Sequence, residues 1–599
     1  MCGINGIVRL SSSAPPVDVA VLRRTSEAMA KRGPDGEGIW AAEDGSCGLG
    51  HRRLAIIDLS PTGAQPMAHA NGRYRMVFNG EIYNYKDLRD ALLREGVAFR
   101  SASDSEVILA LFEREGTAAF GKLRGMFALA IWDALERRLV LARDPYGIKP
   151  LYVARQDGWL QFASQVKALE AGRRVAGGID PAAVAAFLLW GSVPEPRTLR
   201  PDIRALPSGC TLTVRDGTVG EPEPYRDVRA LDAVPCGSIR EALASTVRAH
   251  LVADVPVGVF LSAGIDSGII AALARREAGE GLTTITMRFE DFVGTPSDEG
   301  PIAADTAKRL GTRHVERLLT AADLRGLWPE VVAAMDQPSV DGFNTYVVSR
   351  VARDAGFKVV LSGLGGDELF GGYASFREVP ALRRRVASLT GIPGASAAWE
   401  AAARTIGRSR PKLLGVPRYG GSLPGAYFVR RGLFLPEELA EILGDQMAEE
   451  GLRDADPIRA ASMALERAPA EPDPWTAVHL MESTLYMRNQ LLRDSDWASM
   501  AHSLELRVPF VDMRLRDEIA ALDFEPARGG GKRAVAAAVA PELPDIVRSR
   551  PKTGFGIPIA RALAGGDASA TRGGLGSRRL ALRVLDAFGV PLRSLAAAS

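Results

Sequence analysis

The strongest constraint on the fold is a regular alternation of short apolar strands and helices between residues 257 and 361. Strands that alternate with helices in this way form a parallel sheet, and ligands bind at the carboxyl ends of its strands. The hydrophobic spacing predicts strands over 257–261, 283–289, 313–319 and 358–361, and helices over 268–276, 301–310, 321–335 and 345–355. We therefore expect an α/β domain with a binding site at one edge of the sheet.

Two loops that follow strands of this series are candidates for the binding site. The first, Ser262-Ala263-Gly264-Ile265-Asp266-Ser267, is small and flexible and precedes a helix N-terminus, which favours an anion such as phosphate. The second, residues 362–373, is rich in glycine and carries Asp367 and Glu368. Both loops follow strands of one sheet, so we expect them to lie side by side. A turn without a ligand remains the alternative for each loop taken alone.

Residues 1 to about 205 have a different organisation, with short strands separated by Gly and Asp turns. This pattern predicts antiparallel sheets with helices packed outside them. The expected strands are 3–10, 48–58, 74–78, 127–132, 139–143 and 160–163, and the expected helices lie near 18–31, 86–95 and 105–115. Read alone, Asn79-Gly80 is typical of a hairpin turn and Ser103 of a helix cap.

Length and composition limit the function classes. A chain of 599 residues is expected to form two to four domains. A net charge of +2 gives no reason to expect nucleic acid or a membrane as a partner. Four cysteines in a chain of this length do not indicate a disulfide framework. We find no pattern of a signal region and no apolar run of about 20 residues that would indicate a membrane span. We expect a cytoplasmic protein.

The first residues, Met1-Cys2-Gly3-Ile4, suggest a chemistry if Met1 is removed. Cys2 would then carry a thiol and a free α-amine, whose pKa lies near ~8. The amine can take the thiol proton, directly or through water, and the thiolate is the nucleophile. A cysteine at position 2 also occurs by chance, so its neighbours in the fold must decide.

Four polar clusters lie at the ends of the predicted strands: residues 31–35, 50–54, 78–84 and 103–106. Together with Cys2, they resemble the class II glutamine amidotransferase domain, an N-terminal-nucleophile (Ntn) hydrolase with an αββα sandwich. The resemblance implies Cys2 as nucleophile, with the Asn79 side chain and the Gly80 N–H as oxyanion donors. It implies that Arg53 binds the α-carboxylate of glutamine, while Glu81 and Asp104 bind its α-ammonium. Beside the ligand, the resemblance places a strand made of Leu54, Ala55, Ile56 and Ile57.

The second part resembles the synthetase domain of the asparagine synthetase B family, with a helical C-terminal part. The first loop resembles the pyrophosphate loop of PP-loop ATPases, with Ala263 in place of a glycine, and residues 492–494 and 499–510 extend the match. The resemblance covers about residues 1 to 560. It implies that Asp266 and Asp367 hold Mg²⁺ and that Lys552, a catalytic residue, reaches the phosphates. The implied ATP contacts are Leu261, Ser262, Gly264, Asp266, Ser267, Met287, Ser362 and Gly363.

One residue departs from the family pattern. Asparagine synthetases usually have Glu after the Ser-Gly of the second loop, and this chain has Leu364. An apolar side chain can neither accept a proton from ammonia nor hold a cation. Either Glu368 or another acid takes over, or the acceptor is not aspartate.

These observations predict a two-site enzyme. Glutamine is hydrolysed at Cys2, and ammonia passes through an internal channel to a carboxylate that ATP has activated as an acyl-adenylate. The expected acceptor is aspartate, which gives asparagine, AMP, pyrophosphate and glutamate. The alternative is the same chemistry on another carboxylate, such as a sugar acid or a natural-product intermediate. A scaffold protein that retains the fold without turnover is a further alternative.

The expected domain organisation follows the change in composition along the chain. Residues 2–205 form the glutaminase domain, 206–236 a linker, 237–560 the synthetase domain, and 561–599 a loosely held tail with one amphipathic stretch near 580–588. Small molecules are the expected partners, and a homodimer is possible.

Overall fold

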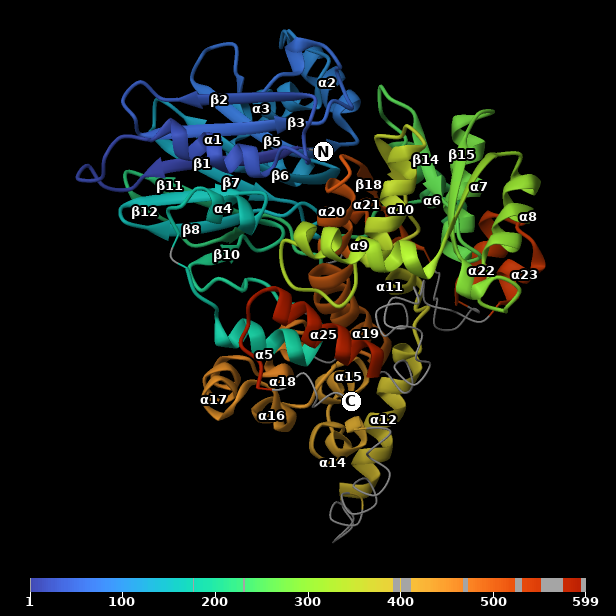
Figure 1. Ribbon diagram of the computed structural model, residues 1–599. Helices are drawn as coiled ribbons and strands as arrows, with labels where there is room; N and C mark the ends of the chain where they lie inside the picture. Colours follow the sequence, from blue (N-terminus) through green and yellow to red (C-terminus); the bar gives the residue numbers. More distant parts are fainter. Residues whose placement is uncertain are drawn as a thin grey trace.

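The computed structural model describes residues 2–175, 177–229, 232–390, 399, 411–466, 472–522, 531–550 and 575–593. Figure 1 shows a layered sheet domain in blue and cyan beside a second sheet with helices in green, and a mainly helical part below both. Among the described residues, no helix combines the length and the apolar character needed to cross a membrane.

The first domain is a sandwich of two antiparallel sheets. The first sheet has the order β10-β8-β9-β1-β3-β2 and the second β12-β11-β7-β6-β5-β4, with β13 paired to β11. The first sheet contains β1 (Gly3–Arg9), β2 (Gly36–Ala41), β3 (Cys47–Arg53), β8 (Tyr152–Gln156), β9 (Trp159–Ala163) and β10 (Ile203–Ala205). The second contains β4 (Met67–Ala68), β5 (Tyr74–Ile82), β6 (Gly125–Asp133), β7 (Arg138–Arg143), β11 (Cys210–Arg215), β12 (Thr218–Val219) and β13 (Glu223–Pro224).

Strand β6 shows why the domain has four layers. Its residues are apolar on both faces. Ala128, Ala130 and Trp132 pack into the core between the sheets, whereas Phe127 and Leu129 belong to the core that contains α3. Helices α1 (Val19–Ala28) and α4 (Val166–Ala171) lie on the first sheet, and α2 (Tyr85–Arg94) and α3 (Asp104–Glu115) lie on the side of the second. The predicted αββα sandwich is confirmed.

Two local predictions in this domain are wrong. The strand expected over 48–58 ends at Arg53, so Leu54, Ala55, Ile56 and Ile57 form no strand. The backbone groups of this segment form hydrogen bonds outside the sheet. Ala55 N–H donates to the Asp35 carboxylate at 2.9 Å, and Ile56 C=O accepts from Asp254 N–H at 2.9 Å. Asn79-Gly80 forms no turn but lies inside β5, opposite Ala128 and Phe127 of β6.

The prediction of a linker over 206–236 is also wrong for the first half of that segment. Strand β11 pairs with β7 over five residue pairs from Thr211↔Ala142 to Arg215↔Arg138. The segment from Cys210 to Pro224 is therefore part of the second sheet of the sandwich.

The second sheet domain is parallel throughout, in the order β16-β15-β14-β17-β18. Its strands are β14 (Val257–Phe260), β15 (Thr283–Phe289), β16 (Arg313–Leu319), β17 (Val359–Leu361) and β18 (Glu505–Arg507). The helices between and around them are α6 (Ile239–His250), α7 (Ile265–Ala278), α8 (Gly300–Leu310), α9 (Ala321–Ala334), α10 (Phe343–Asp354), α11 (Gly366–Phe370), α21 (Met513–Ala521), α22 (Gly531–Val539) and α23 (Asp545–Ser549). The predicted parallel α/β domain is confirmed, and β18 adds a strand from far along the chain.

The lower part of the molecule is helical (Figure 1). Helix α5 (Pro181–Trp190), from the first third of the chain, packs there against α17 (Asp445–Asp454). The other helices are α12 (Ser375–Thr390), α14 (Val416–Tyr419), α15 (Leu423–Arg431), α16 (Leu439–Leu443), α17 (Asp445–Asp454), α18 (Pro457–Met463), α19 (Pro474–Met481), a π-helical segment (Glu482–Leu492), α20 (Arg493–Met500) and α25 (Leu575–Ala587).

The prediction of a loosely held tail is wrong for the described residues 575–593. In α25, Ala581, Leu582, Val584 and Leu585 are at most 1% exposed and join the core that contains α5 and α16. Arg578 of the same helix forms a two-bond ion pair with Glu438, at 2.7 and 2.8 Å. The amphipathic pattern thus marks a buried helix, because its apolar face meets a complementary surface.

We predict that Leu582→Ala lowers the free energy of unfolding by about 2–5 kcal/mol, because it leaves a cavity in this core. Urea denaturation followed by circular dichroism measures the change. Asp586→Ala, on the exposed side of the same helix, serves as the matched control and shifts stability by about 0.5 kcal/mol or less. Equal effects of the two substitutions would contradict the docking of α25.

Candidate active sites

The first site surrounds Cys2, immediately before β1. The Cys2 backbone N–H donates to Asn79 Oδ1 at 2.9 Å, and Arg32 Nε donates to the Cys2 carbonyl oxygen at 3.1 Å. These bonds fix both sides of the Cys2 backbone, from β5 on one side and from the segment after α1 on the other. Burial raises the pKa of the Cys2 thiol, although a hydrogen bond from the Leu54 backbone acts in the opposite direction. The thiol therefore needs a base before it can react.

Asn79 and Gly80 form the wall of β5 beside Cys2. The Asn79 side chain is fully buried, and its Nδ2 has no hydrogen-bond partner among the described residues. A Cβ on Gly80 would lie 2.1 Å from the Met126 carbonyl oxygen, so only glycine fits there. Because a buried donor without a partner is unfavourable, the free Nδ2–H points to a ligand oxygen beside the sulfur.

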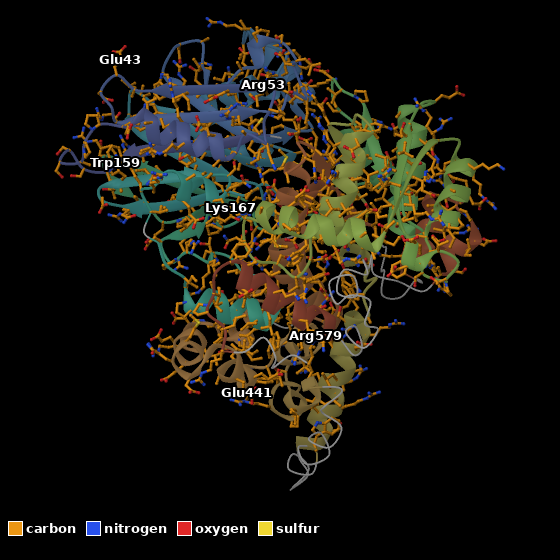
Figure 2. The ribbon with its side chains drawn as sticks, in the orientation of Figure 1. Glu43, Arg53, Trp159, Lys167, Glu441 and Arg579 are labelled. Atoms are coloured by element: carbon orange, nitrogen blue, oxygen red, sulfur yellow. The ribbon has the colours of Figure 1, made fainter. Side chains whose placement is uncertain are left out.

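Charged groups lie near both ends of this wall. Glu81 and Asp104 are buried, and Asp104 accepts a hydrogen bond from Ile82 N–H at 3.0 Å. Burial raises the pKa of Asp104 to about 6, and burial together with Glu505 raises that of Glu81 well above its usual value. Arg53, at the end of β3, donates to the carbonyl oxygens of Asp58 and Ser60. Figure 2 shows Arg53 in the sandwich domain at the top of the view, and Arg579 of α25 in the lower helical part.

The second site is a cavity of about 780 Å³ at the carboxyl edge of the parallel sheet. The two loops meet there: a Cβ on Gly363 would lie 2.7 Å from Ser267 N, and one on Gly366 would lie 2.6 Å from Asp266 Oδ1. The second loop thus needs glycine for its close approach to the first. The cavity is lined by all the residues expected to contact ATP, namely Leu261, Ser262, Gly264, Asp266, Ser267, Met287, Ser362 and Gly363.

A lysine that sequence reasoning missed joins the two loops. Lys532 Nζ donates to both Asp266 and Asp367, and it lines the cavity. Two carboxylates that converge on one cation fit the donor set that Mg²⁺ shares with phosphate oxygens. The run of glycines before Lys532 at the start of α22 is the sequence signal that could have revealed it. Lys552, the expected phosphate ligand, lies outside the described residues.

Leu364, which stands where asparagine synthetases usually have Glu, lies in the second loop near two acids and a tyrosine. Leu364 lines the cavity, as do Asp367 and Tyr373. Glu368 is not among the described residues that line it; its carboxylate accepts from Tyr373 Oη–H at 3.0 Å. Burial and the neighbouring Asp367 raise the pKa of Glu368 to about 7. Glu368 therefore lies behind Tyr373 and does not take the place of an acid at position 364.

Buried charges connect the two sites. Arg32 Nη1 and Nη2 bind the Asp496 carboxylate of α20 at 2.7 and 3.0 Å, and both side chains are at most 4% exposed. Lys149 Nζ lies 3.9 Å from Asp496. These residues come from both domains and lie far apart in the chain. The sequence placed Arg32 in the polar cluster 31–35, but no local pattern indicated its pairing with Asp496.

Comparison with known proteins agrees with the two sites. A family model described as a glutamine amidotransferase domain matches residues 1–226, and one described as asparagine synthase matches residues 238–585. The chain belongs to the asparagine synthase family. It is therefore a glutamine-dependent amidotransferase of the asparagine synthetase type, in a family that uses ATP as a substrate.

Curated relatives match most of the chain. The putative glutamine-hydrolysing asparagine synthetase of Mycobacterium tuberculosis (strain H37Rv) is 35% identical and covers 95% of this chain and 89% of that protein. Asparagine synthetase 1 of Bacillus subtilis is 31% identical, over 93% and 87%. Asparagine synthetase B of Escherichia coli is 34% identical, over 63% and 66%.

We predict that Asp496→Asn destabilises this family member by about 3–5 kcal/mol, because it leaves the Arg32 guanidinium buried without a full counter-charge. It also lowers the rate of glutamine hydrolysis, since Arg32 holds the Cys2 carbonyl. Asp305→Asn, which breaks the exposed Asp305–Arg309 pair, is the control and changes stability by about 1 kcal/mol or less. Chemical denaturation and a glutaminase assay measure both effects, and wild-type values for Asp496→Asn would refute the role of this pair.

Proposed function

We propose that Cys2, after loss of Met1, is the nucleophile of a glutaminase site that supplies ammonia to the cavity above the parallel sheet. The observation that carries this proposal is the buried Asn79 side chain, whose oxygen accepts from Cys2 N–H while its Nδ2 has no partner among the described residues. An oxyanion that forms on the carbon attacked by Cys2 is the partner that this donor lacks.

Each residue of the first site has a role in this proposal. The α-amine of Cys2 takes the thiol proton, and the thiolate attacks the side-chain amide of glutamine. Asn79 Nδ2–H and Gly80 N–H stabilise the oxyanion, and the α-amine passes the proton to the nitrogen that leaves as ammonia. Water then hydrolyses the γ-glutamyl thioester. Arg53 binds the α-carboxylate of the substrate, with Leu54, Ala55, Ile56 and Ile57 beside it, and Glu81 and Asp104 bind the α-ammonium.

In the second site, ATP occupies the cavity with its phosphates on the two loops. The acceptor carboxylate, which we propose to be that of aspartate, attacks the α-phosphate and releases pyrophosphate. Ammonia then displaces AMP and forms the amide. Asp266 and Asp367 would hold Mg²⁺, which would supply positive charge beside the phosphates. Lys532, which spans the same two carboxylates, adds positive charge to this end of the site. The phosphate contact that we propose for Lys552 lies outside the described residues.

Ammonia must travel between the sites inside the protein. Free ammonia at neutral pH is mostly protonated and cannot attack, so an enclosed passage keeps it reactive. The buried contact between the Cys2 region and α20 supports a transfer path along this interface.

The same proposal covers the domain organisation and the compartment. Residues 2–205 together with β11 to β13 carry the glutaminase site, and residues 237–560 carry the synthetase site. None of the four cysteines, all of which are described, forms a disulfide, which suits a reducing cytoplasm.

The direct test of this function is Cys2→Ala. We expect glutamine-dependent amide formation to be abolished, while synthesis from added ammonium salts continues at the wild-type rate, because the second site is intact. Cys236→Ala, which alters the partly exposed cysteine, is the control and leaves both activities unchanged. Product amide, measured by chromatography with either nitrogen source, distinguishes the outcomes. Equal loss of both activities would count against separate sites.

A second prediction concerns the oxyanion donor. Asn79→Asp keeps an oxygen for Cys2 N–H but replaces the Nδ2–H donor with an acceptor. We expect kcat for glutamine hydrolysis to fall by about 10²–10³-fold, as for loss of one oxyanion donor elsewhere. Ammonium-dependent synthesis by the same variant should be unaffected, which shows that the protein is folded. A fall of less than about 10-fold would remove Asn79 from this role.

A further inference from the structure

Two acids that the proposed mechanism does not use line the synthetase cavity: Asp494, which is buried, and Asp341, which is half-buried. Asp494 accepts hydrogen bonds from Ser339 Oγ–H at 2.6 Å and from Trp497 Nε1–H at 2.8 Å. Asp341 accepts from Gly342 N–H at 2.9 Å. A Cβ on Gly342 would lie 3.1 Å from Asp494 Cγ, so the backbone next to one acid packs directly against the carboxyl group of the other.

An unpartnered hydroxyl lies beside this pair. Ser495 is only 5% exposed, and its Oγ has no hydrogen-bond partner among the described residues. Ser495 also lines the cavity. A buried hydroxyl without a partner points to a polar ligand group, because leaving it unpaired is unfavourable.

The charges of the side chains that line the cavity indicate which chemical group of the ligand would bind there. The only cationic side chains among the described lining residues are Lys532 and Arg550. Lys532 is engaged by Asp266 and Asp367, and Arg550 donates to the Pro296 carbonyl oxygen. Arg493, next to Asp494 in sequence, donates to the Val193 carbonyl oxygen at 2.7 Å and lies 3.8 Å from Glu195.

The two acids therefore lie close together in the cavity wall, and the two cationic side chains among the described lining residues are bound to other groups. Burial raises the pKa of both groups, and the charge of Asp341 adds to the shift of Asp494. A ligand cation placed between them would relieve this repulsion. Leu364, in the same cavity, adds no charge of its own, and Asp367 of the second loop is paired with Lys532.

We propose that Asp341, Asp494 and Ser495 form the subsite that binds an ammonium group of the acceptor acid. This inference rests on the proposed function, because it places the acceptor in the same cavity as ATP. The acceptor class is a carboxylic acid that carries an amino group, which includes aspartate and excludes acids without one.

The test is ATP–pyrophosphate exchange, which reports adenylation of the acceptor without ammonia. It is run with pairs of acids that differ only in the amino group: aspartate and succinate, glutamate and glutarate, β-alanine and propionate. In the wild-type enzyme, kcat/KM of the amino-bearing member of an active pair should exceed that of its partner by about 10–100-fold, as for a hydrogen-bonded charge. In the Asp341→Asn and Asp494→Asn variants this ratio should fall towards one, because KM for the amino-bearing acid rises.

Controls keep the outcomes separate. Glutaminase activity at Cys2 reports that each variant is folded, and Ser495→Ala, which removes one hydroxyl, should reduce the ratio even if the other variants fold poorly. Asp305→Asn on the exposed face of α8 should leave the ratio unchanged. A wild-type enzyme without preference for amino acids, or variants that retain the full preference, would overturn the subsite. Absence of exchange with every acid, in an enzyme that hydrolyses glutamine, would instead refute the proposed acceptor chemistry, and the subsite with it.

Discussion

The Arg32 guanidinium is the interaction on which the two-site arrangement depends. It donates to the Cys2 carbonyl and binds Asp496 through two nitrogens, in surroundings that exclude water. A buried guanidinium is tolerated only with its partners in place, and the planar fork fixes the direction of the carboxylate. The position of Cys2, the nucleophile that we propose, is thereby tied to α20 in the second part of the chain.

Helix α20 carries this link into the synthetase cavity. Asp494 and Ser495 line the cavity, whereas Asp496 contacts Arg32. Residues two apart on an α-helix point about 200° apart, so one helix presents acids to both sites without any loop between them. A second charged contact also joins the two domains. Arg507 of β18 pairs with Glu505 at 2.5 Å and lies 3.6 Å from Glu81 of the first domain. The domain interface is therefore built from the same elements that form the two sites.

The sequence predicted best what local periodicity encodes. The parallel strands and the two loops follow from apolar runs and from turns rich in small residues, whereas the residues around the cavity were expected from the resemblance to the family. It failed where distant groups decide the local structure. Leu54 to Ile57 look like strand residues, but Asp35 and Asp254 take their backbone groups. The segment before residue 225 looks like a linker, but β11 completes a sheet, and α25 is held by a core that only the fold creates. The pairing of Arg32 with Asp496, and of Lys532 with both loops, joins distant parts of the chain, and local periodicity does not encode such contacts.

The central claim is that nitrogen released at Cys2 reaches the acceptor without mixing with the solvent. The most direct measurement supplies glutamine labelled with ¹⁵N in its side-chain amide, together with an excess of unlabelled ammonium, and determines the isotope content of the product amide by mass spectrometry. The account predicts a product that carries mainly the glutamine nitrogen, despite the excess outside. A product whose isotope content matches the ammonium in solution would contradict it.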